Sequence, residues 1–465
     1  MDVSQSFTSS KELQAFLYGK SLLIDELSDF SPILQEHVEH GYITYEKGIV
    51  EQKARYSCRR CGTEDQRHFY SHICARCGKI CAYCRNCIIM GKVRSCESLI
   101  SWTGPPYSFS KLENALEWSG TLSPAQQEAS SIVVEAVKNK KVCLVWAVCG
   151  AGKTEVLFEG IAAALARGER VCISTPRTDV VLELAPRLKA AFPHVPVAAL
   201  YGGSEEKSIC AQLVISTTHQ LLRYKNAFDL VVVDEVDAFP YSADQALQYA
   251  VAQSRKPSSA LVYLTATPSR SLRKRAATNE ILSVTIPARF HRHSIPVPEY
   301  RWCGNWKKSF SKKKIPKQVH AWYSQQLSNQ TPFLLFFPTI RLMNEYLPLF
   351  QQEYPELLSV HSEDEDRKEK VQSLREGKVL GLLTTTILER GVTIPRLNVA
   401  VIGAEEAIFT ESALVQIAGR VGRKKDAPDG DIIFFHYGKT WAMKRAVAQI
   451  NSMNEAALER GLIDV

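Results

Sequence analysis

Two series of short apolar runs, each alternating with helical stretches, dominate the sequence and restrict its fold. Runs of about four to eight apolar residues separated by helical patterns are typical of buried parallel strands with crossover helices. The first series consists of VCLVWAV at 142–148, RVCISTP at 170–176, QLVISTTH at 212–219, DLVVVDE at 229–235 and ALVYLTATP at 260–268. The second consists of FLLFFPT at 333–339, LLSVHS at 357–362, VLGLLTTT at 379–386, VAVIGAE at 399–405 and DIIFFHY at 431–437. The pattern predicts an α/β chain with two parallel-sheet lobes of similar size.

A basic segment, NWKKSFSKKKIPK at 305–317, separates the two series. Its lysines are interleaved with Trp306 and Phe310, which modestly favours contact with a nucleic-acid strand over a plain solvated linker. We therefore expect five parts along the chain. They are a mostly helical lead-in at 1–55, a cysteine-rich module at 56–100, a first lobe at 121–290, a basic linker at 291–317 and a second lobe at 318–465.

Charge and hydropathy restrict the class of protein. The net charge of +8 permits nucleic-acid binding without requiring it. No apolar run approaches the roughly 18 residues needed to span a bilayer. The first residues, MDVSQSFTSSKELQ, lack the basic and then apolar layout of a signal peptide. We expect a cytoplasmic protein, with a peripheral position at the inner face of the cell membrane left open.

The stretch AVCGAGKT has the composition of a phosphate-binding loop and lies between an apolar run and a helical pattern at 154–169. Gly150 and Gly152 allow the backbone to approach phosphates, and the loop amides and the helix N-terminus then face the anion. Lys153 would contact the β- and γ-phosphates of ATP, and Thr154 would hold Mg²⁺. The expected nucleotide-binding residues of the loop are Ala147, Val148, Cys149, Gly150, Ala151, Gly152, Lys153 and Thr154.

An acidic pair ends the apolar run DLVVV of the first series. Asp234 and Glu235 stand where the carboxyl end of a buried strand would lie beside the phosphate loop. A Mg²⁺-associated aspartate and a water-activating glutamate are required at this place in an ATP hydrolase. We predict that Asp234 helps to hold Mg²⁺ and that Glu235 activates the attacking water.

The order of four motifs resembles that of the superfamily 2 helicases and translocases. The motifs are A-x-x-G-x-G-K-T at 147–154, D-E-x-D at 234–237, T-A-T at 265–267 and Q-x-x-G-R-x-x-R at 416–423. This superfamily commonly begins its phosphate loop with Ala, as Ala147 does here. A closer similarity, to the late competence protein ComFA family of Gram-positive bacteria, is carried by STTHQLL at 216–222, DEVDAFPY at 234–241, TTTILERGVTIP at 384–395 and QIAGRVGR at 416–423.

The resemblance implies two RecA-like lobes and a cytosolic ATPase that acts in the uptake of transforming DNA. It also implies binding of single-stranded DNA and cooperation with the ComFC protein at the membrane DNA-uptake channel. In the first lobe, Gln126 resembles the glutamine that reads adenine, and Thr265 and Thr267 would sense closure of the cleft. In the second lobe, Thr384 to Thr386 and Arg390 would do so.

The resemblance also implies a catalytic role for Gln416, Arg420 and Arg423. The two arginines are three residues apart, so on a helix they would share a face and reach ATP across the cleft between the lobes. An arginine delivered in cis can accelerate hydrolysis about 10³-fold or more. Thr393 departs from the R-G-x-D-x-P pattern of the wider superfamily, so a ribose or inter-lobe contact of that aspartate is not carried over.

Eight of the 13 cysteines lie between Cys58 and Cys96. Cysteine pairs of the form C-x₂-C in a lysine- and arginine-rich segment predict Zn²⁺ sites. Spacing alone would pair Cys58 and Cys61 with Cys74 and Cys77. The family resemblance favours a first site and a second, nested one. The first consists of Cys58, Cys61, Cys84 and Cys87, and the second of Cys74, Cys77, Cys81 and Cys96.

Three other functions stay open at this stage. A replication-restart helicase resembling PriA combines a similar motor with cysteine pairs, although it carries them within the motor. An RNA helicase would usually carry the aspartate that Thr393 replaces. In a nucleotide-gated DNA-binding scaffold, ATP would change affinity without moving a strand. The leading prediction is an ATP-dependent translocase or helicase on single-stranded DNA.

Overall fold

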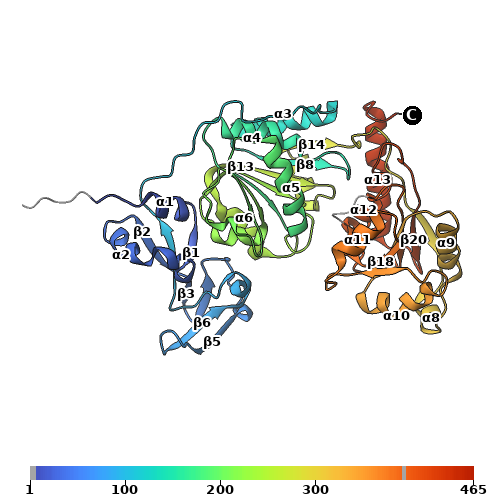
Figure 1. The fold of residues 1–465 in the computed structure, drawn as a ribbon, viewed down its shortest axis with the longest axis horizontal. Coiled ribbons are helices and arrows are strands. Elements are labelled where there is room, and N and C mark those ends of the chain that lie inside the picture. Colours follow the sequence, from blue (N-terminus) through green and yellow to red (C-terminus); the bar gives the residue numbers. More distant parts are fainter. Residues whose placement is uncertain (1–6, 390–393, 465) are drawn as a thin grey trace, which may run out of the picture.

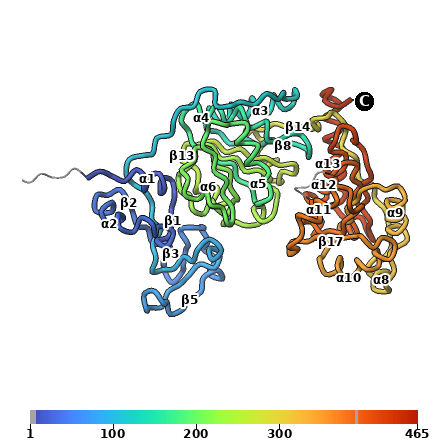
Figure 2. The backbone as a smooth tube through the Cα atoms, in the orientation of Figure 1, coloured from blue at the N-terminus to red at the C-terminus, as the bar shows by residue number. Residues whose placement is uncertain are grey.

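The computed structural model describes residues 7–389 and 394–464, and Figure 1 shows that they form three parts. An N-terminal module (residues 7–102) lies beside a first lobe, and a second lobe lies on the opposite side of that first lobe. Figure 2 shows the same order in the backbone trace. Arg390 and Thr393 lie outside the described residues. No helix within those residues is long and apolar enough to cross a membrane.

The first lobe is built on a seven-stranded sheet in which every pair of neighbours is parallel. β9 and β11 are buried at every position, because helices cover both faces of the sheet. In spatial order the strands are β10 (Val197–Leu200), β11 (Leu213–Thr217), β9 (Val171–Thr175), β12 (Phe228–Asp234), β13 (Arg255–Thr265), β8 (Val142–Ala147) and β14 (Leu282–Ile286). Its helices are α3 (Pro124–Lys138), α4 (Phe158–Leu165), α5 (Thr178–Ala191), α6 (Gln245–Ser254) and α7 (Arg270–Ala277), with short 3₁₀ turns η4 (Glu155–Leu157), η5 (Glu206–Ser208) and η6 (Thr218–Arg223).

The second lobe is built on a six-stranded sheet, also parallel throughout. In spatial order the strands are β15 (Glu299–Trp302), β20 (Ile432–His436), β19 (Asn398–Ile402), β16 (Phe333–Phe336), β18 (Gly381–Thr384) and β17 (Leu358–Val360). Its helices are α8 (Trp306–Ser311), α9 (Lys317–Ser328), α10 (Ile340–Gln351), α11 (Arg367–Arg375), α12 (Glu411–Ala418) and α13 (Trp441–Glu459), with the 3₁₀ turn η7 (Thr386–Glu389). The two parallel-sheet lobes expected from the apolar runs are confirmed.

The segment expected as a basic linker carries regular structure. β15 forms the edge strand of the second sheet, and α8 packs against α10, where Phe310 stacks on Tyr346. Trp306 and Phe310 are four residues apart on one face of α8, and both are buried in the core of the second lobe. The lysines between them face solvent. Because they are buried, these two aromatic side chains cannot stack on a nucleic-acid strand, and the prediction that favoured such contact is wrong.

The N-terminal module contains more strand than the helical lead-in that the sequence suggested. Its three-stranded sheet has the order β1 (Ser21–Leu23), β7 (Ser98–Trp102) and β2 (Ile43–Lys47), so the segment after the cysteines pairs with the segment before them. Two hairpins follow, one of β3 (Ile49–Gln52) and β4 (Arg55–Cys58) and one of β5 (Phe69–Ile73) and β6 (Ile80–Cys84). The remaining elements are α1 (Lys11–Leu17), α2 (Ser31–Glu39) and the 3₁₀ turns η1 (Ile24–Phe30), η2 (Gln66–His68) and η3 (Arg85–Met90).

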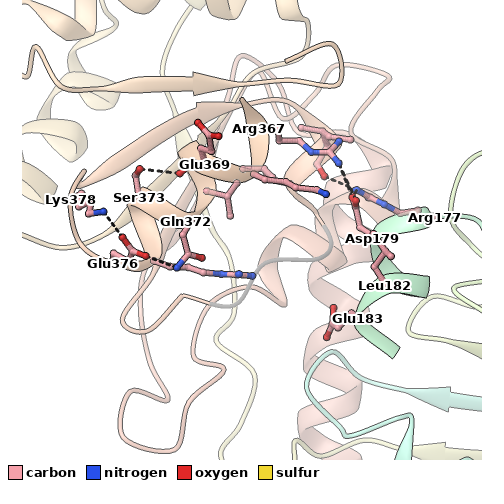
Figure 3. Close-up of a pocket in the computed structure, with 15 residues that line it drawn as sticks. Arg177, Asp179, Leu182, Glu183, Arg367, Glu369, Gln372, Ser373, Glu376 and Lys378 are labelled. Atoms are coloured by element: carbon pink, nitrogen blue, oxygen red, sulfur yellow. Dashed lines mark hydrogen bonds and ion pairs between the residues drawn. The ribbon is translucent and has the colours of Figure 1, made fainter. Parts of the chain in front are cut away.

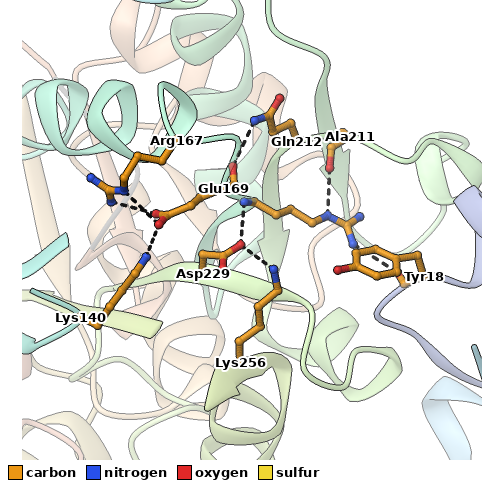
Figure 4. A network of polar contacts seen from close by, with 9 residues as sticks. Tyr18, Lys140, Arg167, Glu169, Ala211, Gln212, Asp229 and Lys256 are labelled. Carbon is orange, nitrogen blue, oxygen red and sulfur yellow. Dashed lines mark hydrogen bonds and ion pairs between the residues drawn. The ribbon is translucent and has the colours of Figure 1, made fainter. Parts of the chain in front are cut away.

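The N-terminal module is joined to the first lobe by a continuous apolar core and by partly buried charges. One cluster of buried residues includes Cys58 and Cys87 of the module together with Leu221 and Leu247 of the lobe. Glu26 of the module accepts hydrogen bonds from Arg223 of the lobe at 2.5 Å and from Arg60 at 3.3 Å. Figure 4 shows a polar network in the first lobe that includes the ion pair of Lys140 and Glu169. The network reaches the N-terminal module where Arg170 donates to the carbonyl of Tyr18.

Candidate ATP site and cysteine clusters

The phosphate-binding motif forms the loop that follows β8. Gly150 and Gly152 have φ values of +84° and +67°, which favour glycine because other side chains are strained there. Ala147 is buried at the strand exit, where a small side chain fits. The helix expected directly from Thr154 begins instead with the 3₁₀ turn η4, and α4 follows at Phe158.

Gln126 braces the phosphate loop. Its Nε2 donates to the carbonyl of Ala151 at 2.8 Å and to that of Gly152 at 3.2 Å, and its Oε1 accepts from the backbone of Ser123. A Cβ added at Gly152 would lie 2.5 Å from this Nε2, so the loop and the glutamine fit only with glycine there. The role of Gln126 in reading adenine stays a prediction.

The acidic pair stands at the end of β12, as the sequence predicted for the carboxyl end of a buried strand. The Asp234 carboxylate accepts a hydrogen bond from the backbone N–H of Glu235 at 2.8 Å, and Glu235 has a φ of +54°. This left-handed residue ends the strand and turns the chain beside the phosphate loop. Strain of this kind in a non-glycine residue is common at active sites.

A cleft of about 780 Å³ brings residues of both lobes together. From the first lobe, its walls include the phosphate loop and the acidic pair, and from the second, residues around the end of α12. The predicted site residues that line it are Cys149, Gly150, Gly152, Lys153, Thr154, Asp234, Glu235, Gln416, Arg420 and Arg423. Among the described residues, the other predicted members of the site (Gln126, Ala147, Val148 and Ala151) are buried around the loop and do not line this cleft.

The two arginines do not share a helix face, because α12 ends at Ala418. Gly419 caps the helix, and Gly422, with a φ of +66°, turns the chain between them. Arg420 is buried, and its Nε and Nη2 donate to the carbonyl of Glu389 at 2.8 and 2.6 Å. Arg423 is half-buried, and its Nε donates to the Gly419 carbonyl at 2.8 Å. The arginines thus differ in burial and in the backbone carbonyl to which each donates.

Direct contacts cross the cleft at the phosphate loop. The Cys149 thiol donates to Oε1 of Gln416 at 3.1 Å. A Cβ at Gly419 would lie 2.5 Å from the Cys149 Cβ, so the close approach of the lobes requires glycine at this helix end. The structure thus places Gln416 against the phosphate loop, a contact that the sequence motif alone did not predict.

Asp237 of the D-E-x-D motif is bonded by three hydroxyl groups. Thr265 donates to Oδ1 at 2.5 Å, Thr267 donates to Oδ2 at 2.6 Å, and Ser412 of α12 also donates to Oδ2 at 2.6 Å. Sequence reasoning missed Ser412. Its spacing of four residues before Gln416 on one helix was the signal that could have revealed it.

A second cavity, of about 740 Å³, lies between α5 of the first lobe and α11 of the second. Figure 3 shows Arg177 and Arg367 converging on Asp179, with Arg367 reaching it across the lobes at 3.0 Å. Arg177 also donates to the carbonyl of Ile387 in the second lobe at 3.1 Å. Arg375, at the end of α11, lines both this cavity and the first cleft.

Eight cysteines gather in two quartets, and the sulfur atoms of each lie within 4.8 Å of one another. Thiolates held tetrahedrally at about 2.3 Å from Zn²⁺ lie about 3.8 Å apart. In the first quartet (Cys58, Cys61, Cys84, Cys87) the sulfur atoms of Cys58 and Cys87 lie 3.7 Å apart, and those of Cys61 and Cys84 lie 3.6 Å apart. In the second (Cys74, Cys77, Cys81, Cys96) the sulfur atoms of Cys74 and Cys96 lie 3.7 Å apart, and those of Cys77 and Cys81 lie 3.3 Å apart. These are the two sets that the family resemblance favoured, and the set suggested by spacing alone is not formed.

The surroundings of the two quartets differ. The first quartet is fully buried, while Cys96 of the second is exposed. The thiols of the first quartet hydrogen-bond one another, which lowers the pKa of Cys58 and raises the pKa of Cys61 and Cys87. At Cys74, hydrogen bonds from the backbone of Cys77 and Arg76 lower the pKa to about 7. Both quartets have donors that could hold Zn²⁺.

Comparison with known proteins agrees with this arrangement. The competence protein ComFA of Bacillus subtilis (strain 168) is 51% identical over 455 residues, which cover 98% of each chain. The ComFA of Streptococcus pneumoniae (strain ATCC BAA-255 / R6) is 38% identical, over 88% of this chain and 92% of that protein. Family models match the ComFA N-terminal domain at residues 5–101, the res subunit of type III restriction enzymes at 119–270 and the helicase conserved C-terminal domain at 313–425.

Solved structures share the fold of the two lobes. Dbp5 of S. cerevisiae, bound to RNA and ADP BeF3, is 17% identical, with a TM-score of 0.51 over 72% of this chain and 92% of that one. RecG bound to a three-way DNA junction is also 17% identical, with a TM-score of 0.50 over 74% of this chain and 47% of that one. The chain is thus a member of the competence protein ComFA family, an ATP-dependent DNA helicase or translocase with two RecA-like lobes and an N-terminal cysteine module.

Proposed function

We propose that this protein is a translocase that hydrolyses ATP to move along single-stranded DNA and so drives the uptake of transforming DNA during genetic competence. The observation that carries the proposal is the cleft in which Lys153, Asp234 and Glu235 of one lobe face Arg423 of the other. A motor needs this division, because hydrolysis then depends on how the two lobes are placed. The family of the chain supports the competence role.

Each residue of the cleft has a chemical task in this proposal. Lys153 and the loop amides bind the phosphates, while the Thr154 hydroxyl and the Asp234 carboxylate would hold Mg²⁺, which neutralises phosphate charge. Glu235 orients and deprotonates the attacking water. Arg423 stabilises the charge that develops on the transferred phosphoryl group. Gln416, held against the loop by Cys149, keeps the end of α12 close to the phosphates.

Contacts between the lobes would convert hydrolysis into movement. Asp237 belongs to the same acidic motif as Glu235 and is bonded to Ser412 of the second lobe. On the α5–α11 side, Arg177 and Arg367 share Asp179. A DNA phosphate would compete with that carboxylate for the two guanidinium groups, so strand binding would alter the same lobe contacts. Arg375 joins this cavity to the ATP cleft.

Both cysteine quartets would hold Zn²⁺, which fixes four thiolates in one tetrahedral arrangement and so staples a small module. The first quartet lies in the core shared with the first lobe, so its metal would keep the module seated on the motor. The second lies toward solvent. We assign it a role in presenting the β5–β6 hairpin to DNA or to a partner protein.

The proposed setting is the cytoplasmic side of the cell membrane. There the protein would work with a ComFC-type partner and the DNA-uptake channel, pulling the incoming strand through. The support is family membership. A co-purification of this chain with the ComFC protein of the same cell tests the partner directly, and an absence of complex in the presence of ATP and single-stranded DNA would contradict it.

The deciding experiment compares the ATPase rate with single-stranded DNA, duplex DNA and RNA. We expect the largest stimulation with single-stranded DNA, and Lys153→Ala should abolish hydrolysis while the protein stays folded. Displacement of streptavidin from a biotinylated strand then separates movement from nucleotide-gated binding. Stimulated hydrolysis without displacement would refute translocation, and stimulation by RNA alone would refute the DNA assignment.

A further inference from the structure

The segment that leaves β14 contacts the phosphate loop from behind. The carbonyl of Ile286 accepts a hydrogen bond from the N–H of Val148 at 3.1 Å, and the N–H of Phe290 donates to the carbonyl of Gly150 at 3.2 Å. Figure 1 shows β14 at the side of the first lobe nearest to α13. The chain therefore passes along the phosphate loop before it enters the second lobe.

The same segment also holds the turn between the two arginines of the second lobe. Nη1 of Arg289 donates to the carbonyl of Gly422 at 2.5 Å, and Nε2 of His291 lies 3.0 Å from the same oxygen. Because a carbonyl can only accept, this Nε2 carries the proton of the histidine. A Cβ at Gly422 would lie 1.9 Å from the carbonyl oxygen of Pro428, so this tightly packed turn admits only glycine.

Arg289 is the residue of this segment that stands between the two loops. It is 2% exposed, and its Cγ lies 3.6 Å from the place that a Cβ of Gly150 would occupy. Its Nε and Nη2 have no hydrogen-bond partner among the residues that the structure describes. Burial, with a smaller contribution from the charge of Arg423, lowers its pKa to about 10.

A buried guanidinium with unpaired N–H groups is costly and is not expected from packing alone. An apolar side chain of the same length would fill the space more cheaply. Arg289 does not line the cleft, so contact with ATP does not explain it. Its position instead suits a structural role, because this one side chain contacts both the phosphate loop and the turn that precedes Arg423 and so sets the distance between them.

We infer that Arg289 is a positioning residue that places Arg423 in the ATP cleft by bracing the Gly422 turn against the phosphate loop. The inference rests on the proposed role of Arg423 in hydrolysis. If Arg289 acts through Arg423, its removal should reduce the maximal rate, since misplacing a catalytic group by about 1 Å can cost roughly 10²-fold. ATP binding depends on Lys153 and the loop amides and should change little.

The test is a double-mutant cycle of Arg289→Met and Arg423→Ala, read by kcat and KM for ATP with saturating single-stranded DNA. Arg289→Met keeps the length of the side chain and removes its donors. We expect it to lower kcat by roughly 10- to 10²-fold with KM within about threefold. Added to Arg423→Ala, it should cause no further loss, because both changes then remove the same contribution.

Arg289→Lys and Arg292→Met are the matched variants. Arg289→Lys keeps the charge and a donor nitrogen that can reach one acceptor, so it should regain part of the rate. If Arg289→Met does not fold, the rate of Arg289→Lys decides the question. Arg292 belongs to the same segment but is exposed and paired with Asp464, so Arg292→Met should behave as the unmodified protein does. Equal rates for Arg289→Lys and Arg289→Met in folded protein would overturn the positioning role.

Two outcomes separate the inference from the proposed function. If Arg423→Ala is slow but Arg289→Met is not, or if their losses multiply, the positioning role of Arg289 is overturned while the cleft arginine stands. If Arg423→Ala keeps the normal kcat, the proposed role of Arg423 fails, and the inference fails with it.

Discussion

The hydroxyl of Ser412, at the start of α12 in the second lobe, donates a 2.6 Å hydrogen bond to Oδ2 of Asp237 in the first lobe. The same oxygen accepts a hydrogen bond from Thr267, and Thr267 and Ser412 lie 2.8 Å apart. One carboxylate is thus shared between the T-A-T motif and the second lobe. Because Asp237 is three residues from Asp234, a change in lobe contact can be transmitted along a short stretch of chain to the proposed Mg²⁺ ligand.

Ser412→Ala should weaken this coupling. A hydrogen bond to a charged group contributes about 1.5–3 kcal/mol, so we expect DNA-stimulated hydrolysis to fall roughly 10-fold while hydrolysis without DNA changes little. The measurement is the ratio of the two rates. Ser131→Ala is the control, because the Ser131 hydroxyl donates to the carbonyl of Gln127 within α3, away from the lobe contact. An unchanged ratio in Ser412→Ala would remove this contact from the coupling.

The two cysteine quartets should differ in what their loss does. Cys58→Ala breaks the quartet in the core shared with the first lobe, so we expect release of one zinc ion, lower thermal stability and a loosened module. Cys74→Ala breaks the quartet nearer to solvent and should release one zinc ion with hydrolysis retained. Bound zinc, counted after protein denaturation, is expected to fall from two to one in each variant. A count of one in the unmodified protein would contradict the second site.

Lys20, at the contact between the N-terminal module and the first lobe, should make the stability of that contact depend on pH. It is 4% exposed and donates to the carbonyl of Lys207, and burial followed by repulsion from Arg170 lowers its pKa to about 7. The unfolded chain holds this proton up to about pH 10.4, so between pH 7 and that value the unfolded state binds more protons. Stability from this group therefore rises with pH across that window.

Replacing Lys20 tests whether the free energy of unfolding rises with pH as this argument predicts. We expect Lys20→Met to be more stable at pH 7 than the unmodified protein and to lose part of the rise in midpoint between pH 7 and pH 9. Denaturant unfolding at several pH values measures both. Lys47→Met, which changes an exposed lysine of β2, should leave the pH dependence as it is. A steeper rise in Lys20→Met would show that the sign is wrong.

The sequence predicted the lobes well because buried parallel strands tend to be continuous apolar runs, as β16 (FLLF, buried at every position) is here. It also predicted the order of the motifs around the cleft, since each motif is short and follows a strand or ends a helix. The basic segment at 305–317 was misjudged, because Trp306 and Phe310 are only two apolar residues and their helical spacing is brief.

Contacts made by single residues between distant segments could not be read in the same way. Ser412, Arg289 and Asp179 act through partners more than 100 residues away, and no local pattern marks such pairs. The helix face expected for Arg420 and Arg423 failed for a local reason, because Gly419 and Gly422 end the helix between Gln416 and the second arginine. Their different environments lead to a prediction that the motif alone does not give.

Arg423→Ala and Arg420→Ala should fail in different ways. Arg423 is half-buried in the cleft wall, so its loss should lower the DNA-stimulated kcat by roughly 10²-fold or more, with nucleotide affinity and stability nearly unchanged. Arg420 is buried and donates twice to the carbonyl of Glu389, so its loss removes bonds that fix η7 beside the cleft. We expect Arg420→Ala to lower stability by about 1–3 kcal/mol in addition to its effect on rate.

Three measurements on both proteins separate the two roles: equilibrium binding of a fluorescent nucleotide, turnover and thermal unfolding. If Arg423→Ala were the less stable protein and Arg420→Ala the one that lost only its rate, the assignments would have to be exchanged, with Arg420 as the group that stabilises the transition state.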